Sequence, residues 1–252
     1  MQITTEPAVR VYNAQGVHEI ILVCEHASAF IPEQYQNLGL DNNAAQSHAA
    51  WDPGAANTAH YLADRLNAVL VESTISRLVY DCNRPPESAT AMPAKSEIFT
   101  IPGNRNLSDE QKQYRIENYY NPFKAQLARS IEQHPVAAVL VTVHSFTPVY
   151  NGIKRPVEIG FLHDQNSQLA ETMLDVASGY NIQLNQPYGI ADGVTHTLKL
   201  HGVENGLHNV MIEIRNDLIQ SDSQCRQMAE HLELWLTQSL PKLETQPRLT
   251  VE

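Results

Sequence analysis

The sequence is short of cysteine and of long hydrophobic runs, and each shortage excludes a class of protein. Its three cysteines, Cys24, Cys82 and Cys225, lie far apart and form no CxxC pair, which argues against a disulfide framework or a zinc ribbon. The longest apolar stretches are only about as long as a strand, so neither a signal peptide nor a membrane span is expected. These features favour a protein of the reducing cytoplasm.

Positive charge is also scarce. Lys and Arg number 17 against 28 Asp and Glu, which gives a formal net charge of −11. This balance argues against a nucleic-acid-binding face and against an anchor for anionic membranes. A small anionic molecule is compatible with it, because a few buried arginines outweigh the global field locally. The sequence leaves the oligomeric state open.

The 252 residues are 42% hydrophobic and 18% charged, as is typical of a globular protein with a substantial core. Short apolar β-type runs alternate along the chain with segments of helical periodicity. Ser108 with Gln111 and Ser221 with Gln224 form possible capping boxes for two of the helices. The predicted strands are 19–24, 69–73, 76–80, 137–144, 157–162 and 208–214, and the predicted helices are about 55–69, 109–133, 167–178 and 222–239.

This alternation predicts an α/β fold with a mixed, mostly parallel sheet and helices on both faces. No composition break or internal repeat divides the chain, so a single domain over 1–252 with its core at about 17–240 is expected. The loop 81–107 is rich in Pro, Asn and Ser and is longer than a connector needs, which indicates a functional loop over a cleft. The segment 185–206 is similarly irregular, and the tail after Pro241 is expected to be peripheral.

Polar groups follow the predicted strands where ligands bind in open α/β sheets, beyond the carboxyl ends. His26 follows the first run, Asp81 and Arg84 follow the run 76–80, and His144 and Glu213 end two later runs. Two histidines with a nearby carboxylate are the ligand set of a catalytic zinc site with an open position. Because the chain has no HxxE or HExxH spacing at these residues, a metal site and hydrogen-bonded structural histidines both remain open readings.

Several motifs between about residues 17 and 220 resemble the N-formylglutamate amidohydrolase family, which is similar in fold to the zinc carboxypeptidases and the aspartoacylase-type deacylases. The resemblance implies a zinc-carboxypeptidase/phosphorylase-hydrolase-like fold. The order of the motifs is also similar to that of the carboxypeptidase site. The motifs are CEHAS (24–28), HAAWDPGA (48–55), SRLVYDCNRP (76–85), IPGN (101–104), HSFTPVYNG (144–152), NQPYG (185–189) and IEIRNDLI (212–219).

Carried over residue by residue, the resemblance implies that His26 and His144 are metal ligands. It implies that Asn83 and Arg84 bind a substrate carboxylate. A planar arginine suits this task because it offers a carboxylate two parallel hydrogen bonds. The late carboxylate, Glu213, takes the role of general base.

The middle metal ligand departs from the carboxypeptidase pattern, which has a Glu three residues after the first His. That position is Ala29 here. Asp52, in the WDPGA segment, is the favoured replacement, and Glu25 and Asp81 are alternatives. The implied cofactor is one divalent metal, Zn²⁺.

Other candidates have a structural reading beside the functional one. Arg77 is predicted to contact the substrate or stabilise the oxyanion, although a structural salt bridge would suit it as well. Arg215 lies on the same strand face as Glu213 and is predicted to orient that carboxylate or to bind substrate. Residues that could reach the reacting group or the mouth of the site, with packing or exposure as the alternative, are Tyr188, Tyr150, His196 and His201.

The predicted function is therefore metal-dependent amide hydrolysis of an anionic N-acyl amino acid. The resemblance implies N-formyl-L-glutamate as substrate, with formate and L-glutamate as products, and a place in histidine degradation. One alternative is a related deacylase or carboxypeptidase-like enzyme acting on another N-acyl amino acid. Another uses Ser145 or Cys24 as nucleophile beside a histidine, but no GxSxG elbow supports it. A non-catalytic binding protein that kept the fold is the third.

Overall fold

The computed structural model of the chain describes residues 7–136 and 138–243. Most of the tail predicted to be peripheral, and the first residue of the predicted strand 137–144, lie outside the described residues. None of the described helices is long and apolar enough to span a membrane.

A seven-stranded sheet forms the centre of the molecule, in the order β1-β3-β2-β6-β11-β9-β10. Neighbouring strands are parallel except at β1–β3 and β11–β9. The predicted mixed, mostly parallel sheet is thus confirmed. Within this sheet, β1 and β10 are the strands that were not predicted. The strands are β1 (Val9–Tyr12), β2 (Ile20–Cys24), β3 (Val69–Ser73), β6 (Val139–Phe146), β9 (Ile159–Leu162), β10 (Ile182–Leu184) and β11 (Asn209–Arg215).

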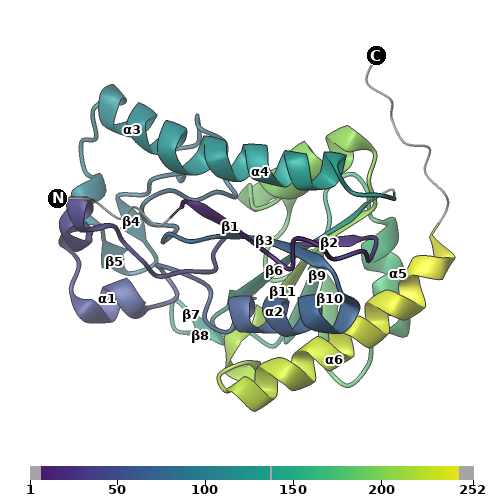
Figure 1. Cartoon of the computed structure of the whole chain (residues 1–252). Helices are drawn as coiled ribbons and strands as arrows, with labels where there is room; N and C mark the ends of the chain where they lie inside the picture. Colours follow the sequence, from purple (N-terminus) through teal and green to yellow (C-terminus); the bar gives the residue numbers. More distant parts are fainter. Residues whose placement is uncertain (1–6, 137, 244–252) are drawn as a thin grey trace.

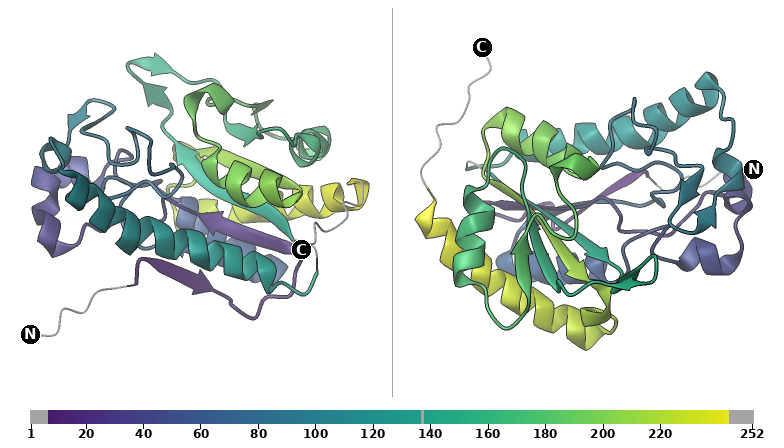
Figure 2. Two further views of the ribbon diagram at one scale, coloured as in Figure 1. Left: turned by 90° about the horizontal axis from the view of Figure 1, so that it is seen from above. Right: turned by 180° about the vertical axis from the view of Figure 1, so that it is seen from behind.

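Helices cover both faces of the sheet, with α3 and α4 above it and α2 and α6 below it in Figure 1. The same layers appear from behind in Figure 2. Both predicted capping boxes are present, at Ser108 and Ser221. A π turn joins α3 to α4 and produces the long predicted segment. The helices are α1 (Asn42–Gln46), α2 (Ala55–Leu66), α3 (Asp109–Arg115), α4 (Asn121–Glu132), α5 (Gln168–Val176) and α6 (Asp222–Ser239).

Short elements fill the connections. Two hairpins flank the main sheet. In Figure 1, β4 (Lys95–Ser96) and β5 (Phe99–Thr100) lie to its left, and β7 (Val149–Tyr150) and β8 (Ile153–Lys154) lie at its lower edge. The remaining turns are 3₁₀ or π helices at Glu33–Gly39, Pro102–Asn104, Ile116–Tyr120, Ile190–Asp192, Leu198–Gly202, Val203–Asn205, Asn216–Leu218 and Leu240–Lys242.

The central strands are mostly apolar because each of their faces packs on a different core. In β2, Ile20 and Leu22 belong to the core between the sheet and helices α2 and α6. Ile21 and Val23 belong to the core between the sheet and α4. Side chains alternate between faces along a strand, so a strand covered on both faces is apolar at most positions. This accounts for the apolar runs from which the strands were predicted.

The predicted strand at 76–80 is wrong. These residues form a buried turn, in which the Ser76 hydroxyl and the Arg77 amide both donate to the carbonyl of Ala50. Leu78, Val79 and Tyr80 are fully buried in the core under α4. These residues are apolar because loops and α4 bury them, although they pair with no neighbouring strand. Periodicity alone could therefore not separate a buried turn from a buried strand.

Gly160 lets the segment before Tyr188 cross close over β9. A Cβ at this position would lie 1.9 Å from the Gln186 carbonyl oxygen. We expect Gly160→Ala to lower the free energy of unfolding by about 1–3 kcal/mol, because backbone must shift to admit the methyl group. Urea unfolding measures this. Gly189→Ala is the control, since its Cβ would meet no other atom closer than 3.6 Å; equal losses in both variants would contradict the explanation.

Candidate functional site

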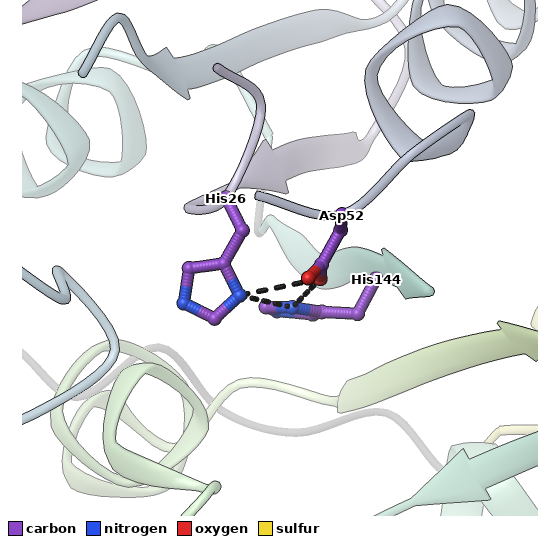
Figure 3. A group of neighbouring side chains, drawn as sticks. All are labelled: His26, Asp52 and His144. Carbon is purple, nitrogen blue, oxygen red and sulfur yellow. Dashed lines mark hydrogen bonds and ion pairs between the residues drawn. The ribbon is translucent and has the colours of Figure 1, made fainter. Parts of the chain in front are cut away.

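Three buried side chains meet beyond the carboxyl ends of the central strands. His26 lies two residues after β2, His144 lies in β6, and Asp52 lies just before α2. Figure 3 shows the two rings and the carboxylate facing one another. Asp52 Oδ2 is 3.2 Å from His26 Nδ1 and 3.0 Å from His144 Nδ1, and the two nitrogens are 3.2 Å apart. The structure thus brings together the two predicted histidine ligands and the favoured third residue.

This group has the donors of a divalent metal site. Its three ligand atoms lie within 4.8 Å of one another and all three residues are buried. Two imidazole nitrogens and one carboxylate oxygen form a set typical of catalytic zinc, which keeps a fourth position open. In the structure one oxygen of Asp52 contacts both imidazole nitrogens. A cation at the centre would bind all three ligand atoms at once. The residues therefore fit a bound metal ion.

The outer nitrogens of both rings contact buried carboxylates. His26 Nε2 lies 2.7 Å from Asp81 Oδ1, and His144 Nε2 lies 3.0 Å from Glu25 Oε2. Such carboxylates orient a metal-binding imidazole and raise its basicity. Glu25 and Asp81, the alternatives considered for the third ligand, thus lie behind the two rings, and neither belongs to the three-atom cluster.

The backbone ties Asp52 to both histidine segments. Its amide donates to the His26 carbonyl, and its Oδ2 accepts from the Ser145 amide at 3.2 Å. The chain then turns into α2 at Gly54, whose φ of 82° is unfavourable for other residues. A Cβ there would lie 2.3 Å from the Ile219 carbonyl oxygen. The Asp-Pro-Gly sequence therefore suits a tight turn that delivers a carboxylate between two strands.

The charges in this cluster support one another. Burial opposes ionisation of Asp52, but His26 and His144 outweigh it and hold the pKa of the carboxyl well below its usual range. Burial likewise disfavours a charged His144, but Glu25 and Asp52 raise the pKa of its imidazole well above the ordinary value. Negative charge thus surrounds the two imidazoles. It favours positive charge at this position, either as a protonated ring or as a metal cation held between the rings.

Glu213 lies beside the cluster on β11, directly opposite His144 in the parallel ladder. The residue is buried, and its Oε2 has no hydrogen-bond partner in residues 7–136 and 138–243. Burial raises the pKa of Glu213 to about 7, with His144 opposing the rise and Asp52 adding to it. A carboxyl that exchanges its proton near neutral pH has the property required of a general acid and base.

Arg77 connects the carboxylates on one wall of the site. Its Nη1 lies 3.4 Å from Asp52 Oδ1 and its Nη2 lies 3.0 Å from Asp81 Oδ2. Burial would lower the pKa of Arg77, but Asp81 and Asp52 raise it instead. The salt bridge considered from the sequence is present, and Arg77 also lines the cavity described next.

A cavity of about 270 Å³ contains the cluster, Glu213 and Arg77. Both irregular segments contribute to its wall, since 81–107 supplies Arg84 and Glu97 and 185–206 supplies Tyr188. The predicted functional loop therefore does lie over a cleft. Tyr150, from the β7–β8 hairpin, lines it as well. This volume suits a small-molecule substrate.

Asn83 and Arg84 both line the cavity, but their polar groups differ in availability. The Asn83 amide donates to the Val194 carbonyl at 2.6 Å, and its oxygen accepts from the Thr197 amide at 3.0 Å. Arg84 donates to carbonyl oxygens and to the Thr90 hydroxyl, and no carboxylate within the described parts of the chain pairs with it. Asn83 thus ties its turn to the segment around Val194 and Thr197. Of the two residues, Arg84 carries the charge that could bind an anionic ligand.

Arg215 does not reach this cavity. Its guanidinium contacts Asp217 at 2.8 Å and Glu158 at 3.4 Å, at the edge of β9. Acidic residues next to the ends of β9 and β11 pair with the arginine. The predicted contact with Glu213 is therefore not formed, and the predicted role in substrate binding stays a prediction that the cavity lining does not support.

His196 and His201 also lie outside the lining of the metal-cluster cavity. His196 pairs with the Tyr120 hydroxyl at 2.8 Å and faces a second cavity of about 700 Å³, which borders the first at Arg84. His201 is buried, and this burial lowers its pKa to about 4.

His48 and Glu97 are cavity residues that were not singled out from the sequence. His48 Nδ1 lies 3.7 Å from Asp52 Oδ1, and its Nε2 lies 4.0 Å from Glu97 Oε1. Burial lowers the pKa of His48 to about 4. The place of His48 in the HAAWDPGA motif, four residues before Asp52, could have indicated that it lies in the site. Nothing in the sequence distinguishes Glu97.

The nucleophile alternative finds little support. The Ser145 hydroxyl donates to the Pro53 carbonyl at 2.9 Å and is not bonded to either histidine. Cys24 is completely buried, and burial raises the pKa of its thiol well above the ordinary value. Neither group is activated as a serine or cysteine nucleophile must be.

Comparisons with known proteins agree with this geometry. The model of the N-formylglutamate amidohydrolase family matches residues 18–220. The crystal structure of gene product Atu2144 from Agrobacterium tumefaciens is 48% identical, with a TM-score of 0.92 over 94% of this chain and 96% of that one. N-formylglutamate amidohydrolase from Ralstonia eutropha JMP134 is 17% identical, with a TM-score of 0.61 over 92% and 96%. Curated proteins gave no match.

The likeness to the Ralstonia enzyme confirms the fold expected from the sequence motifs. The family match spans most of the chain and includes every residue of the cluster and of the cavity wall. The protein is therefore an amidohydrolase, and the chain belongs to the N-formylglutamate amidohydrolase family.

Proposed function

We propose that this protein hydrolyses N-formyl-L-glutamate to formate and L-glutamate with one zinc ion held by His26, Asp52 and His144. The observation that carries the proposal is the convergence of their three inner ligand atoms beside Glu213, a buried carboxylate with an unpartnered oxygen. The family match supports an N-acyl amino acid as substrate. Histidine degradation, which the resemblance implies, is the metabolic setting that we propose.

Zinc, when bound, lowers the pKa of a water molecule and polarises the acyl carbonyl. Glu213 takes the proton from the attacking water as the bond from water oxygen to acyl carbon forms. It then gives that proton to the amide nitrogen as the carbon–nitrogen bond breaks, which releases the acid and the free amine. The raised pKa of Glu213, about 7, allows it to perform both steps near neutral pH.

The cavity wall provides the other roles that we assign. Arg77, a positive charge that lines the cavity, stabilises the developing oxyanion in this scheme. Tyr188 lies on the wall with Glu213 and contacts the substrate. Asn83 acts through Arg84, since its side chain fixes the turn from which Arg84 extends. The three cysteines are buried free thiols, which supports the cytoplasmic location that we propose.

Metal analysis combined with a release assay tests the function. The purified protein is expected to contain about one zinc per chain and to release formate from N-formyl-L-glutamate. A chelator should abolish this activity, and added zinc should restore it. N-acetyl and N-succinyl derivatives of Glu, Asp and neutral amino acids identify a related deacylase. Activity that survives complete metal removal would contradict the proposal, and binding of all substrates without turnover would indicate a binding protein.

Arg84 is expected to bind a carboxylate of the substrate. Arg84→Ala should lose about 2–5 kcal/mol of substrate binding, because the substrate charge is left unpaired. Arg84→Lys should restore only part of it, since lysine lacks the bidentate fork. The measurement is kcat/KM for N-formylglutamate and for an analogue with the relevant carboxylate amidated. An equal loss on both substrates would show that Arg84 supports the fold instead.

A further inference from the structure

Arg155 lies among aromatic rings at the edge of the cavity. It directly follows the β7–β8 hairpin, which is labelled in Figure 1. The central carbon of its guanidinium is 4.5 Å from the ring centre of Tyr150, 4.9 Å from that of Tyr188 and 5.5 Å from that of Phe146. Because Tyr150 and Tyr188 both line the cavity, the cation lies beside the cavity and stacking limits its orientation.

This guanidinium has no anionic partner among the described residues. Its Nη1 donates to the Thr147 carbonyl at 3.4 Å, and the guanidinium also contacts the Tyr188 hydroxyl, where it partly offsets the rise in the pKa of Tyr188 that burial causes. Its neighbours differ, because Arg77 is paired with Asp52 and Asp81, and Arg215 with Glu158 and Asp217. Most of the hydrogen-bonding capacity of Arg155 is thus free for a ligand.

The field of Arg155 reaches the far wall of the cavity. Burial raises the pKa of Glu97, and Arg155 and then Arg77 partly offset this rise. Glu97 belongs to the turn between β4 and β5, on a different hairpin from Arg155. A negative charge placed between these two hairpins would therefore be attracted by Arg155.

We infer that Arg155 determines specificity by binding the second carboxylate of a dicarboxylic N-acyl amino acid, while Arg84 binds the first. The inference rests on the proposed function and names the residue that selects the acidic side chain or the α-carboxylate. Arg84 lines the cavity of about 270 Å³, and Arg155 stacks on two of its lining tyrosines. Neither arginine has a carboxylate partner among the described residues, and together they match a small substrate with two carboxylates. A neutral amino acid would leave one of them without an anion, which is unfavourable in a partly desolvated site.

Kinetics with amidated substrates test the role of Arg155. Arg155→Met keeps the length of the side chain and removes its charge. It should lower kcat/KM for N-formyl-L-glutamate by about 10- to 100-fold, mainly through KM. The loss should be under about threefold on either N-formyl-L-glutamine or the α-amide of N-formyl-L-glutamate, whichever lacks the carboxylate that Arg155 binds. Arg155→Lys should recover part of the loss. An equal loss on all three substrates would overturn the inference.

Equilibrium binding tests Arg155 without any turnover. The wild type should bind glutarate at least about tenfold more tightly than glutaramate, its monoamide, in titration calorimetry, and Arg155→Met should remove this preference. A preference that persists in Arg155→Met, or that is absent from the wild type, would overturn the inference. If the wild type hydrolyses no N-formyl substrate, the proposed function fails, and the glutarate titration still decides the role of Arg155.

Arg226→Met is the matched control for both measurements. Arg226 also stacks on an aromatic ring, 4.2 Å from the centre of Tyr61. It is paired with Asp222 at 2.9 Å on the exposed surface of α6 and does not line the cavity. Its substitution should leave kinetics and glutarate binding unchanged. Thermal unfolding of each variant shows whether the Arg155 variants retain their fold.

Discussion

Replacing His26 and His144 together by alanine is expected to abolish zinc binding and amide hydrolysis at the same time. The two imidazoles supply two of the three ligand atoms that converge within 4.8 Å. A single carboxylate cannot hold a catalytic zinc ion against water, because zinc sites of this kind use three protein ligands. Metal content after equilibration with limiting zinc and dialysis, measured with formate release on the same sample, provides the two readings.

His60→Ala is the matched control for this double substitution. His60 also pairs with a buried carboxylate, Glu72, at 2.9 Å, but it lies outside the cavity. The His60→Ala variant should keep a metal content of one per chain. Asp52→Ala should weaken zinc binding strongly. Asp81→Asn, which alters the partner of the His26 outer nitrogen and the ion pair with Arg77, should weaken zinc binding by about 10- to 100-fold. Full metal occupancy in the double histidine variant would disprove the assignment.

Glu213→Gln is expected to lower kcat by about two to four orders of magnitude while zinc remains bound. The amide keeps the shape of the side chain and cannot accept the proton of the attacking water. Glu213 is not one of the three converging residues, so the coordination sphere should be intact. Single-turnover rates of formate release and metal analysis of the same preparation measure the two effects.

Glu72→Gln provides a comparison for the loss of a buried carboxylate. Glu72 is as buried as Glu213, on β3, and pairs with Arg10 and His60 away from the cavity. It should reduce stability and leave kcat nearly unchanged in the folded protein. If Glu213→Gln loses zinc, Glu213 is a ligand and not the general base. If its kcat stays near the wild-type value, another group transfers the proton.

Much of the fold could be predicted from local pattern. The strands β2, β3, β6, β9 and β11 and the helices α2 to α6 lie at predicted positions, because apolar periodicity reports which face of an element is buried. The two serine capping boxes confirm helix starts by the same local logic. The exception at 76–80 shows the limit of this signal, since a buried turn and a buried strand have the same composition.

The placing of His26, His144 and Glu213 at one edge of the sheet follows from sequence too. Each comes at or just after an apolar run, and parallel strands deliver their carboxyl ends to the same side. The sequence cannot reveal that β6 and β11 are neighbours in register, which sets Glu213 opposite His144. That pairing depends on the order of strands in the sheet.

Only the tertiary structure distinguished among the carboxylates and arginines around the site. Asp52 lies between the two imidazoles, whereas Glu25 and Asp81 contact their outer nitrogens. Arg215 is drawn to acidic residues near the end of β11, and Arg155 is stacked beside the cavity without a carboxylate. The physical reason is that spacing along the chain determines which face a side chain takes. Its partners depend on segments distant in sequence, which only the packing of sheet, turns and hairpins brings within reach.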